Sequence, residues 1–237
     1  MKPDHRVAGA RMRLYSGPLS MFGAKVEIAA LEKGLDVEVV MVPFDMTNLY
    51  EPKHPEVLRI NPKRQVPVLV HGDLEIFDST QIVEYFEDLQ PEPALWPAAP
   101  AERARARLLE LKSDEVFFPP VIRLMGLQET PDDPAAVAAR AAVAACYKEM
   151  EAMLAGRDHV AGSYSHADIA FYMAQLFAAR MGAPMTAATP GLLAWRERVT
   201  ARPAVRAVVG RMAAFLASVG RPLPEFMADL LPAGAAA

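Results

Sequence analysis

The sequence predicts an α/β domain followed by an all-helical domain, and three observations support this fold class. With 237 residues, the chain is long enough to form two hydrophobic cores. Strand patterns and helix patterns alternate only up to about residue 90. Four prolines then fall within residues 91–100, which excludes a regular helix there, and the later segments are rich in Ala, Leu, Glu and Arg.

The first domain begins with the pattern of a β-α-β unit. Residues 12–15 form the first predicted strand, and a turn at Ser16-Gly17-Pro18 leads into a helix over 22–33, which Gly34 closes. The β-branched run at 37–42 is so apolar that we expect this strand to be buried in the sheet. Crossovers of this kind are right-handed and join parallel strands, so we expect the two strands to be parallel.

The second half of this domain has the pattern β-β-α. A short, weak helical turn is expected at 56–60. Strands at 66–70 and 74–77 flank Gly72, which supplies the positive φ that a tight hairpin turn needs. Apolar residues at helical spacing then predict a helix over 80–90. The domain therefore combines a parallel and an antiparallel pair of strands.

The domain boundary is expected near the cluster of prolines. We assign residues 1–93 to the first domain, with 1–11 as an extension, and residues 94–237 to the all-helical domain, with an irregular tail from about 222. Pro119-Pro120 should break or kink the first helix of the second domain. The helices predicted for that domain are 101–125, 134–155, 165–180 and 190–219.

Composition limits the classes of partner. The chain is 52% hydrophobic and 23% charged, as in ordinary globular proteins, and its net charge of −4 without a run of like charges gives no reason to expect nucleic acid. No apolar stretch reaches the roughly 18 residues of a membrane-spanning helix, and the N-terminus has no apolar signal core. We expect a cytoplasmic protein that acts on small molecules.

Cysteine and histidine usage gives no sign of a metal or disulfide. Cys146 is the only cysteine, so it cannot form an internal disulfide, and we expect it to be a small core residue of an alanine-rich helix. The histidines lack the spacing of metal ligands, and no metal is expected. The five are His5, His54, His71, His159 and His166.

The local motifs resemble those of the cytosolic glutathione transferase family, serine-type. The segments 14–20 and 31–35 look like its first strand, catalytic turn and first helix, 61–69 like its most diagnostic segment, and 78–82 like its acidic-Ser segment. In the second half, 162–170 resembles the capping box of the family. The resemblance spans nearly the whole chain and implies a thioredoxin-like N-terminal domain that binds glutathione as co-substrate and a helical domain that supplies the second substrate pocket.

The capping residues of the second half have a structural interpretation. Ser165 and Asp168 are spaced so that each side chain can reach the backbone N–H of the other at a helix start. Trp195 and the segment 202–205 complete the resemblance in this half. We expect these residues to serve folding.

Activation of the glutathione thiol is the chemical problem that such a protein must solve. An ordinary thiol with a pKa of about 8.5 is mostly protonated at pH 7, and lowering it by roughly two units takes about 2.7 kcal/mol. Ser20 lies just before the first helix, six residues before Val26, as the serine of the serine-type classes does. Its hydroxyl would donate a hydrogen bond to the thiolate. The alternatives are Ser16 as the activating hydroxyl, or a Ser20 that only caps the helix.

The resemblance also assigns residues to the rest of glutathione. Val66 would bind the cysteinyl backbone through its own backbone beside a cis Pro67, as in the family. Asp78 and Ser79 offer an acid, a hydroxyl and a backbone amide to the γ-glutamyl ammonium and carboxylate, or else form an ordinary helix cap. Two further residues, Lys53 and Gln65, match basic and amide positions for the glycine carboxylate.

The second substrate pocket is the least defined part of the prediction. Phe117, Phe118, Arg123 and Met125 are the candidates for its wall, although a Phe-Met stripe at helical spacing is more often core. Cys146 argues against the cysteine-type branch of the family, which has a cysteine where this chain has Ser20.

The function that the resemblance implies is a glutathione transferase, acting on an electrophilic and largely apolar small molecule by conjugation or displacement, for example in detoxification. A glutathione-dependent catabolic isomerase, dehalogenase or ether-cleaving enzyme is one alternative. A non-catalytic binding module of the same fold and a redox enzyme that uses Cys146 are two others. The family usually forms homodimers, so we expect a homodimer. The sequence leaves open the second substrate and the reaction type.

Overall fold

The computed structural model describes residues 9–231, which divide into two compact units. The first unit comprises the described residues up to Ala94, together with 207–222 and 229–231, and the second comprises 95–206 and 223–228. The expected division at 93/94 differs from this mainly in the segments 207–222 and 229–231, which belong to the first unit. The expectations for residues 1–8 and 232–237 lie outside the described residues.

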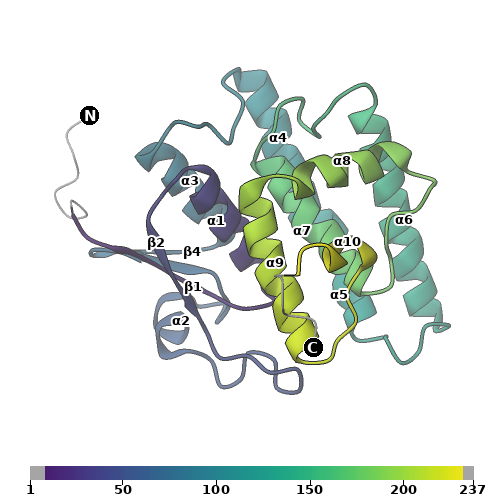
Figure 1. Cartoon of the computed structure of the whole chain (residues 1–237), viewed down its shortest axis with the longest axis horizontal. Helices are drawn as coiled ribbons and strands as arrows, with labels where there is room; N and C mark the ends of the chain where they lie inside the picture. The colour runs from purple at the N-terminus through teal and green to yellow at the C-terminus, as the bar shows by residue number, and fades with distance from the viewer. Residues whose placement is uncertain (1–8, 232–237) are drawn as a thin grey trace. The chain divides into compact units, whose positions relative to one another are not determined.

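A four-stranded sheet forms the centre of the first unit (Figure 1). The strand order is β2-β1-β3-β4, in which β1 and β2 are parallel and the other two pairs are antiparallel. This confirms the predicted β-α-β and hairpin units. The strands are β1 (Met12–Ser16), β2 (Val37–Met41), β3 (Val68–His71) and β4 (Leu74–Phe77).

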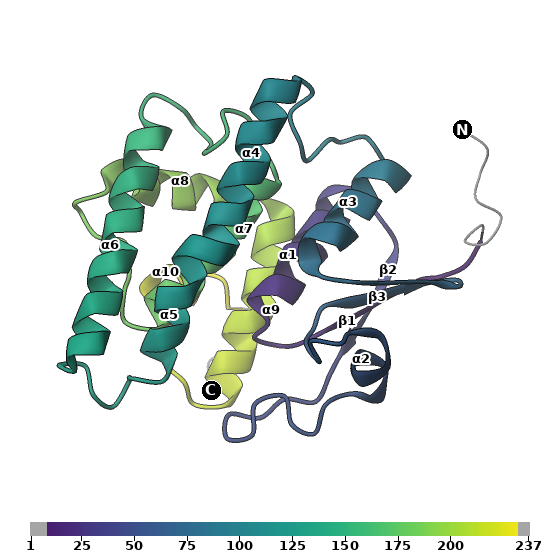
Figure 2. The same cartoon turned by 180° about the vertical axis from the view of Figure 1, so that it is seen from behind.

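Helices cover both faces of the sheet. In the views of Figures 1 and 2, α1 and α3 lie on one face and the short α2 on the other. Val57 of α2 packs with Tyr15, Val42 and Val68 in a small core on its side. The helices of this unit are α1 (Met21–Glu32), α2 (Pro55–Ile60), α3 (Ser79–Leu89) and, from Ala207 onward, α9 (Pro203–Ser218).

The prediction of a fully buried second strand is wrong. All residues of β2 are half-buried except Met41, which is 44% exposed. The reason is topological, because β2 is an edge strand that has β1 on one side only. The residue that is buried is Val42, which follows the strand and joins the core beneath α2.

The second unit is helical throughout its described length. Its central helix, α7, is buried from His166 to Ala178, and α4, α5 and α8 pack against it (Figure 2). The helices are α4 (Pro100–Lys112), η1 (Ser113–Phe117), α5 (Phe118–Met125), α6 (Pro134–Leu154), α7 (His166–Arg180), α8 (Pro190–Thr200) and α10 (Glu225–Ala228).

Prolines modify two of the predicted helices. Pro119 and Pro120 lie in the first turn of α5, directly after the π-helical η1, so the expected kink takes the form of a wider turn that accommodates the missing N–H groups. The single helix predicted over 190–219 is wrong, because Pro203 begins a new helix. The tail expected to be irregular contains α10, in which Met227 is fully buried.

The capping box at the start of α7 is confirmed. Oδ2 of Asp168 accepts the backbone N–H of Ser165 at 3.0 Å. Its other oxygen, Oδ1, accepts the N–H of Val160 at 3.0 Å and the indole N–H of Trp195 at 2.8 Å. Asp168 is fully buried. This one carboxylate therefore joins the start of α7 to α8 and to the loop that precedes α7.

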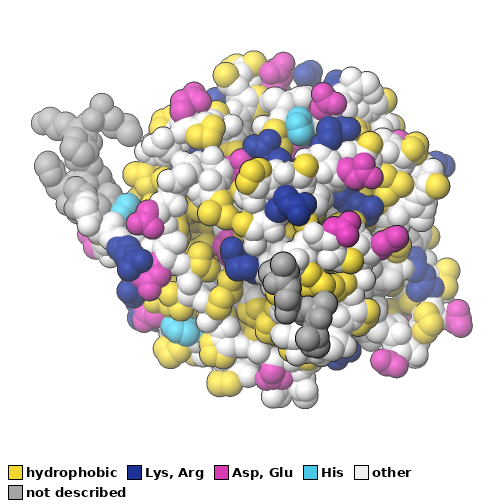
Figure 3. All heavy atoms as spheres, in the orientation of Figure 1, with side chains coloured by type: hydrophobic (Ala, Val, Ile, Leu, Met, Phe, Trp, Pro, Cys, Tyr) yellow, Lys and Arg dark blue, Asp and Glu magenta, His cyan; other side chains and the backbone are white. Residues whose placement is uncertain are grey.

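The surface carries charges of both signs. On the face drawn in Figure 3, basic and acidic side chains are interspersed, in keeping with the small net charge of −4. Within residues 9–231, no helix combines the length and the apolar character that crossing a bilayer requires.

Asp168→Ala should destabilise the protein by at least about 3 kcal/mol, because it leaves buried N–H donors of Val160 and Trp195 without an acceptor. A fall in the midpoint of thermal unfolding would measure this. The matched control is Asp158→Ala, since the Asp158 side chain is 81% exposed and forms a surface ion pair with Arg198. Equal effects of the two substitutions would refute the structural role of Asp168.

Candidate active site

The register of the sheet brings three segments together at one end of the strands, which is called the edge below. Tyr15 of β1 pairs with Val68 of β3, and Val68 also pairs with Phe77 of β4. The chain therefore leaves β1, enters β3 and leaves β4 at the same end of the sheet. The segments that meet there are 16–20, 65–67 and 78–79.

Two helices begin at this edge. The α1 helix starts after Ser20, which follows β1, and α3 starts after Asp78, which follows β4. The first N–H groups of a helix have no partner within it and carry partial positive charge. This edge of the sheet therefore suits a ligand with negative groups.

Ser20 caps α1 and keeps a proton available. The residue is 8% exposed, and Oγ accepts the N–H of Gly23 at 2.9 Å. A hydroxyl has one proton and two lone pairs, and the Ser20 proton has no acceptor among residues 9–231. The cap and a hydrogen bond to an anion can therefore coexist.

Ser16, the alternative hydroxyl, donates its proton elsewhere. It is fully buried, and Oγ donates to Oε1 of Glu27 at 2.6 Å. The other oxygen of Glu27 accepts from Nη2 of Arg211, on α9, at 2.6 Å. The Ser16 proton is thus bound to a carboxylate within the protein, whereas the Ser20 proton is not.

Two glycines allow the close packing of this turn. A Cβ on Gly23 would lie 2.2 Å from Ser16 Oγ and 3.1 Å from Ser20 Oγ, so only glycine fits between the two hydroxyls. A Cβ on Gly17 would lie 2.3 Å from the Tyr50 ring. Gly23 and Tyr50 are not among the predicted site residues, because nothing in one sequence shows which residue packs on a helix start.

The loop before β3 is held by the side chain of Asn61, the first residue of the segment 61–69 that carries the family resemblance. Asn61 donates from Nδ2 to the carbonyl of Gln65 at 2.6 Å and accepts the N–H of Lys63 at 2.9 Å. The Val66–Pro67 peptide bond is cis, which confirms the bond that the family resemblance implies. The Gln65 side chain is exposed at this edge.

Asp78 and Ser79 form the start of α3. Oδ1 of Asp78 accepts the N–H groups of Thr80 and Gln81 at 3.1 and 3.3 Å, so the predicted cap is confirmed. Its Oδ2 accepts no hydrogen bond within the described part of the chain. Ser79 is buried as the first helical residue. One carboxylate oxygen therefore remains for a ligand.

Lys53 lies in the loop between β2 and α2, outside the three segments named above. Its ammonium is 3.3 Å from Oε1 of Glu51 and 5.8 Å from the centre of the Tyr50 ring. Tyr50 packs on Gly17, so Lys53 is linked to the Ser20 turn through this ring.

The residues predicted for a second substrate pocket separate into two groups. Phe117 and Phe118 are buried, and they pack on the rings of Tyr147 and Phe177 with centroids 5.2 and 5.4 Å apart. Arg123 and Met125 lie exposed on α5. The packing of the two phenylalanines is that of core residues, the alternative that the sequence left open.

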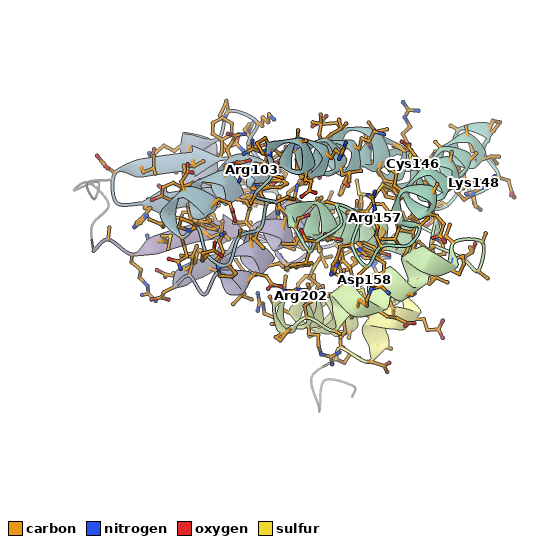
Figure 4. All side chains as sticks on the ribbon, turned by 90° about the horizontal axis from the view of Figure 1, so that it is seen from above. Arg103, Cys146, Lys148, Arg157, Asp158 and Arg202 are labelled. Carbon is orange, nitrogen blue, oxygen red and sulfur yellow. The ribbon has the colours of Figure 1, made fainter. Side chains whose placement is uncertain are left out.

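Cys146 lies on α6, as does Lys148 (Figure 4). Burial, with a smaller contribution from Glu149, raises the pKa of the Cys146 thiol above its ordinary value. A raised pKa leaves less thiolate at neutral pH, which makes this cysteine a poor nucleophile. In the part of the chain that the structure describes, no three His, Cys, Asp or Glu side chains are grouped to hold a metal ion.

A pocket of about 540 Å³ in the second unit contains none of the predicted residues. It lies at the end of α6, where Figure 4 labels Arg157 and Asp158. Glu151 in its wall accepts the N–H groups of Gly191 and Leu192 at 2.8 and 2.7 Å. The carboxylate thus already caps α8, so the helix end is satisfied from within the protein.

Comparison with known proteins finds two family matches. Residues 14–94 match the model for the glutathione S-transferase N-terminal domain, and residues 115–203 match that for the glutathione S-transferase C-terminal domain. Together the two matches cover more than two thirds of the chain.

Individual relatives fall into two groups by coverage. Glutathione S-transferase 3 of Zea mays is 34% identical over 215 residues, which are 84% of this chain and 94% of that protein. A stringent starvation protein A homologue of Coxiella burnetii is 36% identical over 109 residues, or 45% of this chain and 48% of the relative. The chain thus spans about half the length of the first curated relatives that it matches.

A solved structure extends the likeness to three dimensions. The glutathione S-transferase from Rhodospirillum rubrum F11 is 31% identical, with a TM-score of 0.72 over 84% of this chain and 91% of that one.

Gly23→Ala should destabilise the protein by about 2 kcal/mol, because the new Cβ displaces Ser16 from Glu27 and the overpacking outweighs the gain in helix propensity. Chemical denaturation would measure the loss. Gly126→Ala is the control, since its Cβ would meet nothing closer than 3.7 Å. A Gly23 variant as stable as the Gly126 variant would contradict the packing described.

Proposed function

This chain belongs to the glutathione S-transferase family, and we propose that it is a glutathione transferase in which Ser20 activates the thiol for attack on an electrophilic, largely apolar small molecule. One observation carries the proposal: at the start of α1, Ser20 caps the helix through a lone pair and keeps its proton for an anion. The chemistry of the neighbouring groups suits glutathione, which brings carboxylates, an ammonium and a thiol.

Ser20 acts in this proposal as a hydrogen-bond donor and not as a base. A serine hydroxyl does not hold a proton from a thiol at neutral pH, but its O–H stabilises a sulfur anion. The N-terminus of α1 adds positive potential at the same place. A hydrogen bond to a charged group contributes about 1.5–3 kcal/mol, which corresponds to about one to two units of thiol pKa.

The remaining groups at this edge would bind the γ-glutamyl and cysteinyl parts of glutathione. The hydroxyl and the backbone N–H of Ser79 suit the γ-glutamyl carboxylate, and the second oxygen of Asp78 suits the ammonium. The backbone of Val66 beside Pro67 would pair with the cysteinyl backbone, as the family resemblance implies.

The glycine carboxylate end is assigned to Lys53 and Gln65. Lys53 is 22% exposed, and its partner Glu51 is largely exposed, so this ion pair can exchange for a ligand carboxylate at little cost. The exposed Gln65 side chain supplies a neutral donor.

For the second substrate pocket, we propose a smaller set of residues than the sequence predicts. The inward packing of Phe117 and Phe118 supports a structural role, which leaves Arg123 and Met125 as the accessible members of the set. Conjugation or displacement in a detoxifying setting is the reaction class proposed, and isomerisation, dehalogenation or ether cleavage by the same thiolate are its catabolic variants. We place the protein in the cytoplasm.

We also propose that the protein is a homodimer. The exposed apolar side chains Leu108, Leu111 and Val116 follow one another along α4 and η1, and exposed apolar groups of this size favour burial against a partner. Members of the family usually form homodimers, which supports a two-fold arrangement of two chains.

Ser20→Ala should raise the thiol pKa of bound glutathione by about one to two units, because it removes the donor to the sulfur anion. Thiolate absorbance in the ultraviolet, followed against pH in the complex, measures the pKa, and calorimetry measures binding. Ser16→Ala should keep the lowered pKa, since its proton is directed to Glu27.

The control for lost capping is Asp133→Ala, which removes the cap of α6 and should lower stability without changing the thiol pKa. A Ser20 variant that activates the thiol as well as the wild type would disprove the role of Ser20. Failure of the wild-type protein to bind glutathione would favour the non-catalytic alternative.

Leu111→Glu should shift the protein from dimer to monomer, because a charge in an apolar interface costs more than it does in water. Sedimentation over a range of concentrations gives the mass. The matched control is Val137→Glu, an equally exposed apolar side chain on α6. A wild-type mass of one chain at every concentration would rule out the proposed dimer.

A further inference from the structure

A buried carboxylate lies directly behind the Ser20 turn. Glu27, on α1, is 3% exposed. Its two oxygens accept one hydrogen bond each, from Ser16 on one side and from Arg211 on the other, both at 2.6 Å. Arg211 comes from α9, 184 positions further along the chain. Neither Glu27 nor Arg211 is used in the function proposed above.

The carboxylate is close to the point where Ser20 would meet an anion. The same Cβ position on Gly23 lies 2.2 Å from Ser16 Oγ and 3.1 Å from Ser20 Oγ, so the two hydroxyl oxygens are neighbours across Gly23. Glu27 is bonded to the first of these hydroxyls. Only one serine side chain therefore separates a fixed negative charge from Ser20.

A negative charge at this distance opposes a second one. Two like charges in a partly buried site repel each other more strongly than in water, and the group that titrates becomes harder to ionise. Glu27 cannot relax into solvent, because it is buried. A positive partner on the far side of the carboxylate offsets this repulsion, and the Arg211 guanidinium occupies that position.

We infer that Arg211 is a positioning residue for thiol activation: its ion pair with Glu27 offsets the charge that would otherwise oppose a thiolate at Ser20, while Glu27 holds the Ser16 hydroxyl away from the sulfur. The inference rests on the proposed function. It assigns to α9, which the sequence placed in the helical domain, a part in the chemistry of the first unit.

Other charged groups belong to the same surroundings. On α1, the buried Lys25 has its ammonium 5.4 Å from the Phe22 ring. Lys53 and Asp78 flank the proposed glutathione site. These three residues are the same in every variant below, so their contributions cancel when variants are compared.

The test removes the positive charge of Arg211 and the negative charge of Glu27 in separate variants, which should shift the thiol pKa in opposite directions. Arg211→Gln should raise the thiol pKa of bound glutathione by about half a unit, a modest shift because the Arg211 side chain is 51% exposed and screened by water. Glu27→Gln should lower it by a similar amount, since its amide oxygen still accepts from Ser16. The double variant should return to the wild-type value, and Arg211→Lys should keep it.

Thiolate absorbance against pH in the complex with glutathione gives each value, and thermal unfolding of the free proteins shows that each variant is folded. Arg206→Gln, an exposed arginine on the same helix, is the control and should leave the thiol pKa unchanged. Added salt should reduce the effect of Arg211→Gln.

Shifts of the same sign in Arg211→Gln and Glu27→Gln would show a general loss of packing and overturn the inference, as would no shift in either. In both cases a wild type with a lowered thiol pKa leaves the proposed function standing. A wild type that binds glutathione without lowering its thiol pKa would overturn both.

Discussion

The pairing of β3 with β1 on one side and β4 on the other is the constraint on which the candidate site depends. Because Val68 is opposite both Tyr15 and Phe77, the segments beyond these residues have to meet at one edge. A slip of one residue in this register would turn every side chain of β3 to the other face of the sheet and separate the segments. Two helices then start at the same edge, so their N-termini face the same space.

The order of the elements could be predicted from the sequence, because each depends on local patterns. Turn glycines, apolar spacing and prolines mark β1, α1, the hairpin and α3 to within a few residues. The exposure of β2 could not be predicted in this way, since an apolar run is typical of a central strand and only the strand order shows that β2 lies at an edge. Pro203 is a comparable case, because a proline at the first position of a helix and one that interrupts a helix look alike in the sequence.

In the candidate site, too, local motifs could be predicted from the sequence and contacts between separate segments could not. Ser20, Pro67 and Asp78 lie in short motifs, so a family resemblance could identify them, and the structure adds what each side chain already bonds to. The bonds of Glu27 could not be predicted from local motifs, because its partners Ser16 and Arg211 lie 11 and 184 positions away in the chain. Phe117 and Phe118 show the reverse difficulty: a helical stripe of aromatic residues has the same pattern whether it lines a cavity or fills a core, and here packing distances distinguish the two.

The ion pair between Glu27 and Arg211 also bears on the synthesis of the chain. The first unit contains most of its strands and helices within its first 94 residues, but the cation for its buried carboxylate is made much later. A ribosome-bound fragment that ends before α9 would bury Glu27 without its partner or leave α1 loosely packed, and an uncompensated buried charge is costly. Completion of the N-terminal fold is therefore expected only after α9 has been translated, although its sheet is encoded first.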